Sequence, residues 1–238
     1  MKRLAAALGA LAALFAAPAA AFECHTALIL ALDASDSVDP EEADLQRRGI
    51  ATALRDQEVV DALVPAEDYG ALFMAFEWTD PGERQIVVDW TVLKTPEDVA
   101  ALAARFERPV RAYMHGQTGI GAALEFAAQA HRTAPIRCGR RVIDVSGDGP
   151  GNIGPTPRLY RDQGLFNGLI INGLVIRDVI DDYAVQQPTR DPLPYYRDQV
   201  QWGPGSFIMV TPNYKAYAEA MREKLLRELQ PNLAGIAQ

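Results

Sequence analysis

Apolar residues form short, nearly continuous runs that alternate along the chain with segments of helical periodicity. The run Thr26–Asp33 carries no charge before its last residue, which is typical of a strand buried on both faces of a parallel sheet. Asp39-Pro40-Glu41-Glu42 has the capping aspartate, the first-turn proline and the glutamate of a capping box, so it predicts a helix start. The expected strands are 26–33, 69–78, 83–93, 141–146, 169–176 and 206–211. The expected helices are 40–63, 96 to about 109, the Ala-rich part of 116–131, 157–167 and 213–229.

This order of elements predicts an open, doubly wound α/β domain with a mostly parallel sheet and helices on both faces. One early hairpin interrupts the alternation, with a turn at Asp80-Pro81-Gly82. We find no internal repeat and no linker, so residues 22–238 are expected to form a single domain. Residues 178–205 are Pro-rich and aromatic, and we expect an irregular insertion there.

The amino terminus resembles a secretory signal peptide. Lys2 and Arg3 precede the apolar run Leu4–Ala17, and Ala19-Ala20-Ala21 offers a small-residue cleavage site. A membrane anchor is the alternative, but the apolar run is shorter than the roughly 20 residues that a span needs. We therefore expect cleavage of residues 1–21 and a periplasmic or secreted protein in an oxidising compartment.

The two cysteines of the chain, Cys24 and Cys138, are a candidate disulfide in such a compartment. Each lies nine or ten residues before an aspartate that follows a strand-like run, Asp33 and Asp148. If the two strands are parallel neighbours, the sulfur atoms come together; two unrelated free thiols are the alternative.

The charge balance excludes some partners. The chain has 23 Lys and Arg against 31 Asp and Glu, and loss of Lys2 and Arg3 moves the net charge from −8 to −10. An acidic surface disfavours nucleic acid and an electrostatic membrane anchor. Two cysteines are also too few for a Cys-based zinc cage.

Three junctions between strands, loops and helices carry oxygen side chains. Asp33-Ala34-Ser35-Asp36-Ser37 follows the first strand, Thr118 lies in a Gly-rich loop that opens a helix, and Asp148 follows the strand 141–146. In open α/β sheets, ligands bind at the carboxyl ends of strands. Such oxygen atoms suit Mg²⁺, Mn²⁺ or Ca²⁺. Taken alone, the first segment could equally be a turn in which Asp and Ser bond the backbone.

The set Asp33, Ser35, Ser37, Thr118 and Asp148 resembles the metal-ion-dependent adhesion site of von Willebrand factor type A domains. The resemblance covers roughly Thr26 to Leu229 and matches all five motif positions. The signal peptide, the cysteine pair and Tyr195-Tyr196…Gly203-Pro204-Gly205 more narrowly resemble a secreted bacterial von Willebrand A-like family, domain of unknown function 1194.

The resemblance implies a six-strand sheet in the order 3-2-1-4-5-6, with the third strand antiparallel. The first and fourth strands are then neighbours, which supports the Cys24–Cys138 disulfide. It also implies that Ser35, Ser37 and Thr118 bind the metal directly through hydroxyls, or that Thr118 binds through water in some states. Asp33 and Asp148 then act mostly through waters, and the open coordination position takes an Asp or Glu carboxylate of a partner protein.

Other side chains have two interpretations each. Asp144 lies within an apolar strand, either hydrogen-bonded to neighbouring loops or acting on the metal, directly or through its ligands. His115 either borders the site as a plain rim residue or acts in the same indirect way. The insertion 178–205 either packs on its own domain or presents an aromatic partner surface. The aromatic residues of that candidate surface are Tyr183, Tyr195, Tyr196 and Trp202.

The sequence thus predicts an exported, divalent-metal-dependent protein-binding module and not an enzyme. The rival interpretation is a metal-dependent phosphohydrolase that uses Asp33. That chemistry normally needs an aspartate where Ser35 stands, and a lysine between the Thr motif and the last acidic residue. The nearest lysine before Asp148 is Lys94, which precedes Thr118, so the order is wrong. A serine hydrolase is less favoured still, because the sequence has no Gly-x-Ser-x-Gly elbow.

Overall fold

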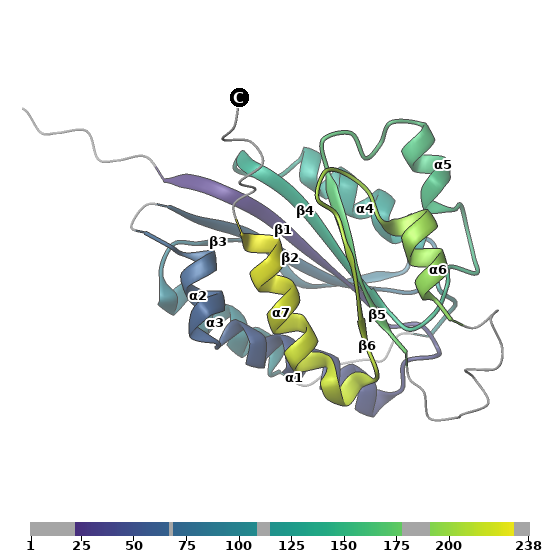
Figure 1. Cartoon of the computed structure of the whole chain (residues 1–238), viewed down its shortest axis with the longest axis horizontal. Helices are drawn as coiled ribbons and strands as arrows, with labels where there is room; N and C mark the ends of the chain where they lie inside the picture. Colours follow the sequence, from purple (N-terminus) through teal and green to yellow (C-terminus); the bar gives the residue numbers. More distant parts are fainter. Residues whose placement is uncertain (1–21, 67–68, 109–114, 178–190, 231–238) are drawn as a thin grey trace, which may run out of the picture.

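The computed structural model describes residues 22–66, 69–108, 115–177 and 191–230, which form a three-layer α/β structure (Figure 1). Its six-stranded sheet has the order β3-β2-β1-β4-β5-β6, and only the β2–β3 pair is antiparallel among the pairs of this sheet. The predicted fold class and strand order are therefore confirmed. The strands are β1 Glu23–Asp33, β2 Tyr69–Trp78, β3 Arg84–Leu93, β4 Cys138–Gly147, β5 Ile170–Ile176 and β6 Ile208–Thr211.

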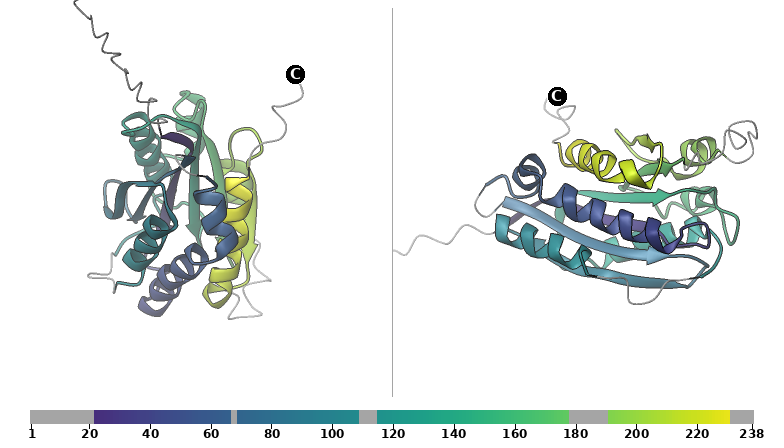
Figure 2. Two further views of the ribbon diagram at one scale, coloured as in Figure 1. Left: turned by 90° about the vertical axis from the view of Figure 1, so that its left-hand side faces the viewer. Right: turned by 90° about the horizontal axis from the view of Figure 1, so that it is seen from below.

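Helices cover both faces of the sheet and enclose two apolar cores (Figures 1 and 2). One core lies under α1, α2, α3 and α7, and the other lies under α4 and the segments around Phe166 and Tyr196. β1 contributes alternate residues to the two cores, which explains its uninterrupted apolar sequence. The helices are α1 Pro40–Leu54, α2 Gln57–Leu63, α3 Pro96–Phe106, α4 Ile120–Arg132, α5 Pro157–Asp162, α6 Leu193–Tyr195 and α7 Tyr217–Leu229.

Two predicted helices are shorter or interrupted. The expected helix 40–63 is broken after Leu54, because the extended residue Asp56 caps a new helix by accepting the backbone N–H groups of Glu58 and Val59. The expected helix 157–167 ends at Asp162, and Gly164 follows with a φ of +76° that favours glycine.

The C-terminal third also differs in detail from the prediction. Residues 193–200, expected to be irregular, form α6 and a π-helical turn, Tyr196–Val200. The last helix begins with a 3₁₀ turn, Tyr214–Ala216, which Asn213 caps, before α7 starts at Tyr217. Residues 178–190, including Tyr183, and the predicted signal peptide 1–21 lie outside the described residues.

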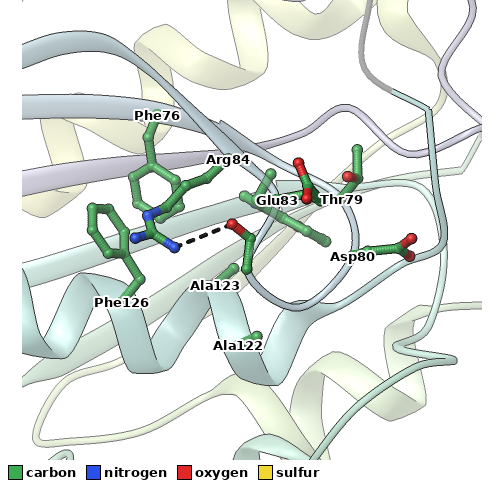
Figure 3. Close-up of a pocket in the computed structure, with 10 residues that line it drawn as sticks. Phe76, Thr79, Asp80, Glu83, Arg84, Ala122, Ala123 and Phe126 are labelled. Atoms are coloured by element: carbon green, nitrogen blue, oxygen red, sulfur yellow. Dashed lines mark hydrogen bonds between the residues drawn. The ribbon is translucent and has the colours of Figure 1, made fainter.

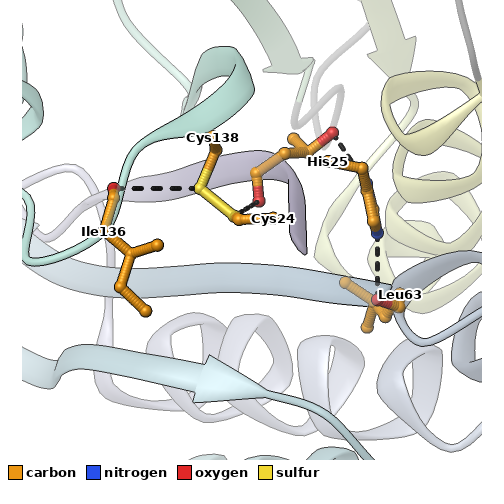
Figure 4. The surroundings of a disulfide bond; sticks show 6 residues. Cys24, His25, Leu63, Ile136 and Cys138 are labelled. Atoms are coloured by element: carbon orange, nitrogen blue, oxygen red, sulfur yellow. Dashed lines mark hydrogen bonds between the residues drawn. A yellow bond between two sulfur atoms is a disulfide. The ribbon is translucent and has the colours of Figure 1, made fainter. Parts of the chain in front are cut away.

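A disulfide joins the starts of the two central strands (Figure 4). Cys24 of β1 and Cys138 of β4 are register partners in the parallel pair, and their Cα atoms lie 4.5 Å apart. His25 lies beside it and bonds Leu63 O through Nε2 at 3.0 Å, which ties β1 to the end of α2. The predicted disulfide is confirmed.

Within the described residues, we find no helix with the length and apolar character needed to cross a membrane.

Candidate metal centre

Two aspartates lie at the carboxyl ends of adjacent parallel strands. Asp33 is the last residue of β1, and Asp148 directly follows Gly147, the last residue of β4. Because β1 and β4 run in parallel, both carboxylates belong to the same edge of the sheet, where ligands bind in open α/β folds. Asp33 is fully buried, whereas Asp148 is partly exposed. One carboxylate therefore lies at the base of the site and the other at its rim.

The two serines follow Asp33 in a tight turn. The N–H of Ser35 donates to Oδ1 of Asp33 at 2.9 Å, and this bond fixes the carboxylate relative to the turn. Ser35 Oγ lies 3.2 Å from Ser37 Oγ, and Ser37 donates to Oδ1 of Asp148 at 2.6 Å. Both serine hydroxyls thus lie between the two strand ends.

Thr118 brings the third hydroxyl from the loop before α4. Its Oγ1 lies 3.4 Å from Ser35 Oγ, and only 5% of the residue is exposed. Asn152 clamps the Thr118 backbone in both directions, since its Oδ1 accepts the Thr118 N–H at 2.9 Å and its own N–H donates to Thr118 O at 3.0 Å. The Asp80 carboxylate accepts the N–H of Gln117 at 2.7 Å. The loop is therefore held from two sides.

Neither Asn152 nor Asp80 was selected as a site residue from the sequence. Asp80 stands in the Asp-Pro-Gly turn that predicts the β2–β3 hairpin, and Asn152 stands in a Gly- and Pro-rich stretch. Both patterns are typical of turns. Only the fold brings these two turns to the loop that carries Thr118.

Four of the five predicted residues bring their side-chain oxygens close together, and Asp33 joins them through the N–H of Ser35; the four are Ser35, Ser37, Thr118 and Asp148. The measured oxygen–oxygen separations are 2.6, 3.2 and 3.4 Å, while adjacent ligands of an octahedral Mg²⁺ lie about 2.9 Å apart, from metal–oxygen distances of 2.0–2.1 Å. Asp33 Oδ2 is buried and has no hydrogen-bond partner among the described residues, as expected of an atom that lacks a further ligand or water. The donor set therefore fits a small divalent cation.

The cluster contains more hydroxyls than carboxylates. In the part of the chain that the structure describes, no group of three or more His, Cys, Asp or Glu side chains is arranged to hold a metal ion. Burial, together with the negative charge of Asp148, raises the pKa of Asp33 to about 7, although the hydrogen bonds from Ser35 act in the opposite direction. A positive charge placed between the two carboxylates would offset both the burial of Asp33 and its repulsion by Asp148.

His115 and Asp36 lie at the rim and bond each other. His115 Nδ1 and Asp36 Oδ1 are 3.1 Å apart, and both side chains are largely exposed. Asp36 Oδ1 also accepts the N–H of Gly116 at 3.2 Å, so this pair ties the serine turn to the loop of Thr118.

Asp144 has a different partner from those that the sequence suggested. Its side chain faces α7, where Lys224 Nζ lies 2.7 Å from its Oδ1. Lys224 also contacts Glu228 at 2.5 Å, and all three side chains are fully buried. Within the described residues, no loop forms a hydrogen bond with Asp144; a helix lysine pairs with it instead, and nothing in the sequence indicated that this lysine is buried.

The candidate aromatic partner surface is only partly exposed. Tyr196 is fully buried, so its assignment to a partner surface is wrong; its ring fills the core between the sheet and α4. Trp202 is half-buried, donates through Nε1 to Phe166 O at 3.1 Å and forms a bridge with Ile171 near the start of β5. Trp202 therefore lies toward the opposite end of β5 from the metal centre. Tyr195 is partly exposed.

A small cavity lies between the β2–β3 hairpin and α4 (Figure 3). Its volume of about 10 Å³ is near the least that can hold one water molecule. Arg84 stacks over the Phe126 ring, 4.2 Å from its centroid, and donates to Gly82 O.

Comparison with solved structures identifies the fold. The chain is similar to von Willebrand factor type A from Catenulispora acidiphila, with 16% identity and a TM-score of 0.58 over 87% of this chain and 43% of that one. It is also similar to proximal thread matrix protein 1 from the mussel byssus, whose structure has a zinc-occupied MIDAS motif. The identity is 15% and the TM-score is 0.58, over 88% of this chain and 48% of that one. A third similar structure is that of an aerotolerance-related membrane protein from Bacteroides fragilis. The identity is 15% and the TM-score is 0.51, over 84% of this chain and 98% of that one. The chain thus spans less than half the length of the first two structures.

These similarities, together with the strand order, show that the fold is that of a von Willebrand factor type A domain. No curated protein matches the chain. A family model described as "Protein of unknown function (DUF1194)" matches residues 23–233. Since the match covers most of the chain, this protein belongs to the DUF1194 family.

Proposed function

We propose that this protein is an exported binding module that grips a carboxylate of a partner protein through a divalent cation. The oxygen set formed by Ser35, Ser37, Thr118, Asp33 and Asp148 is the observation that carries the proposal. Mg²⁺ is the cation of choice, with Mn²⁺ or Ca²⁺ as alternatives, because every donor is an oxygen.

The chemistry of the set explains why a partner would be held. Ser35, Ser37 and Thr118 offer neutral hydroxyls, and Asp33 and Asp148 act mostly through waters. Few anionic groups then touch the cation directly, so the cation can accept a further anionic ligand. Repulsion between an acidic protein and an acidic partner is screened beyond about 8–10 Å, so the cation supplies the local attraction. Within this arrangement, Asp33 orients the serine turn through Ser35 N–H, and Asp148 orients the hydroxyl of Ser37. The zinc-occupied MIDAS motif of the mussel protein supports the proposal.

Calorimetric titration of the chelator-treated mature chain with Mg²⁺ and Mn²⁺ tests whether the protein binds a divalent cation. We expect a dissociation constant between micromolar and millimolar for wild type, as for sites with few charged ligands. The variant Asp33→Ala should lose binding. The matched control is Asp61→Ala, an exposed aspartate of α2 at the other end of the sheet, which should bind as wild type does. Absence of metal-dependent heat in wild type refutes the site.

Capture of partners from an envelope extract tests the second half. A partner should be retained by wild type with Mg²⁺, released by chelator and not retained by Asp33→Ala. Retention that is insensitive to both chelator and the substitution contradicts carboxylate capture through the cation.

A further inference from the structure

Among the described residues, the buried hydroxyl of Tyr196 forms no hydrogen bond. The residue opens the π-helical turn Tyr196–Val200 and is fully buried. Within the described residues, its Oη has no hydrogen-bond partner. Leaving a polar group in this condition costs free energy, so such an atom requires an explanation.

The position of Gly147 shows what this hydroxyl faces. A Cβ on Gly147 would lie 2.5 Å from Tyr196 Oη and 2.7 Å from Asp33 Oδ2. Both oxygens therefore lie against the same point of the β4 backbone, one residue before Asp148. The absence of a side chain at Gly147 leaves the space that lets them approach each other.

The two oxygens are chemically complementary. Asp33 Oδ2 is the second buried atom without a partner at this point, since Oδ1 already accepts the Ser35 N–H. A carboxylate oxygen only accepts, whereas a phenol donates one hydrogen. Burial, followed by the charges of Asp33 and Asp148, raises the pKa of Tyr196 well above its ordinary value, so the phenol keeps its hydrogen.

We propose that Tyr196 is a positioning residue of the metal centre: its hydroxyl donates to Oδ2 of Asp33, directly or through one water, in the space beside Gly147. With Oδ1 held by Ser35 and one acceptor site of Oδ2 held by Tyr196, the carboxylate of Asp33 cannot rotate, and the other acceptor site of Oδ2 stays available to the cation or its water. The role toward a cation rests on the proposed function, but the hydrogen bond itself does not. This assignment also accounts for a buried tyrosine that the sequence placed on a partner surface.

Metal titration of Tyr196→Phe tests the positioning role. The substitution removes one oxygen and keeps the ring, so we expect the fold to persist and the affinity for Mg²⁺ to fall about 10-fold or more, the usual effect of losing a residue that orients a metal ligand. The matched control is Tyr217→Phe, which is equally buried but whose hydroxyl bonds Ser146 Oγ at 3.0 Å. The control should lower stability without changing the affinity. An unchanged affinity in Tyr196→Phe overturns the positioning role and leaves the proposed function intact.

A double-mutant cycle in the presence of chelator tests the hydrogen bond without metal. Urea unfolding is compared for wild type, Tyr196→Phe, Asp33→Ala and the double variant. We expect the loss of the hydroxyl to be costly in wild type and nearly neutral once Asp33 is alanine, because contacting residues are non-additive. Additive effects overturn the bond. If wild type binds no metal, the proposed function and the positioning role fall together, and the cycle still decides the bond.

Discussion

Lys224 is the residue whose replacement should reveal most about how the fold is held together. Its ammonium lies between the carboxylates of Asp144 and Glu228, at 2.7 and 2.5 Å, and none of the three side chains is exposed. Asn172 donates to the same Glu228 oxygen at 2.8 Å, so the cluster joins α7 to the middle of the sheet.

The variant Lys224→Met keeps most of the volume and removes the charge. When Asp144 is ionised, the attraction between the two unit charges 2.7 Å apart is about 6 kcal/mol at an effective dielectric constant of 20, and the cost of desolvation offsets part of it. Removal of one partner from a buried pair leaves uncompensated charge, so we expect the free energy of unfolding to fall by about 3–5 kcal/mol.

The loss should also depend on pH. Burial raises the pKa of Asp144 to about 7, and the attraction of Lys224 opposes this effect. This folded-state pKa lies above the unfolded value. Between about pH 4 and 7 the carboxyl of Asp144 therefore ionises in the unfolded chain but keeps its proton in the fold, so the free energy of unfolding falls as pH rises. Without Lys224 the pKa rises further, so the variant continues to lose stability above pH 7, by up to about 1.4 kcal/mol per pH unit.

Urea unfolding at pH 5, 7 and 8.5 measures both effects. Lys215→Met is the matched control, since Lys215 is exposed in the turn before α7 and should be nearly neutral at each pH. The reasoning is refuted if Lys224→Met loses no more stability than the control, or if its loss does not grow between pH 7 and 8.5.

Three further predictions concern stability. Replacement of Cys24 and Cys138 by alanine should lower the free energy of unfolding by up to about 5 kcal/mol, because the disulfide spans 114 residues and constrains the unfolded chain; an unchanged urea midpoint contradicts this. His131 is almost fully buried, and burial lowers its pKa to about 4, below the unfolded value of 6.5. The stability that neutral His131 contributes is therefore present above pH 6.5 and is lost as pH falls toward 4. Over that range the free energy of unfolding of wild type should fall by about 3 kcal/mol more than that of His131→Gln. Parallel pH profiles of unfolding for the two proteins would contradict this role of His131. Asp39→Ala removes the capping box of α1 and should cost about 1 kcal/mol in thermal or urea unfolding, whereas no change would show that the cap is dispensable.

The sequence alone was sufficient for the strand order once the resemblance was recognised, and for most strand boundaries. β2 ends at Trp78 and β1 ends at Asp33 as expected, because buried parallel strands and a hairpin turn have strong local patterns. Helix breaks were harder to predict. Asp56 looks like an ordinary polar residue within a helical pattern, and only its cap geometry shows that it ends one helix and begins another.

The oxygen set was also predictable as residue types, since the motif names its five members. Its supports were not predictable. Asp80 and Asn152 look like turn residues, and Tyr196 looks like part of an exposed aromatic segment. Each contributes through contacts with residues far away in the chain, and such contacts leave no trace in local periodicity.

The sequence by itself thus determined which segments are buried strands, which helices are capped and which oxygens follow the strand ends, because these properties depend on neighbours a few residues apart. The tertiary structure alone decided that Tyr196 faces Asp33 across Gly147 and that Lys224 neutralises Asp144. The physical reason is the same in both cases. A buried polar atom requires a complementary partner, and the chain supplies that partner from 80 or more residues away, where only the packing of the sheet against its helices brings the two together.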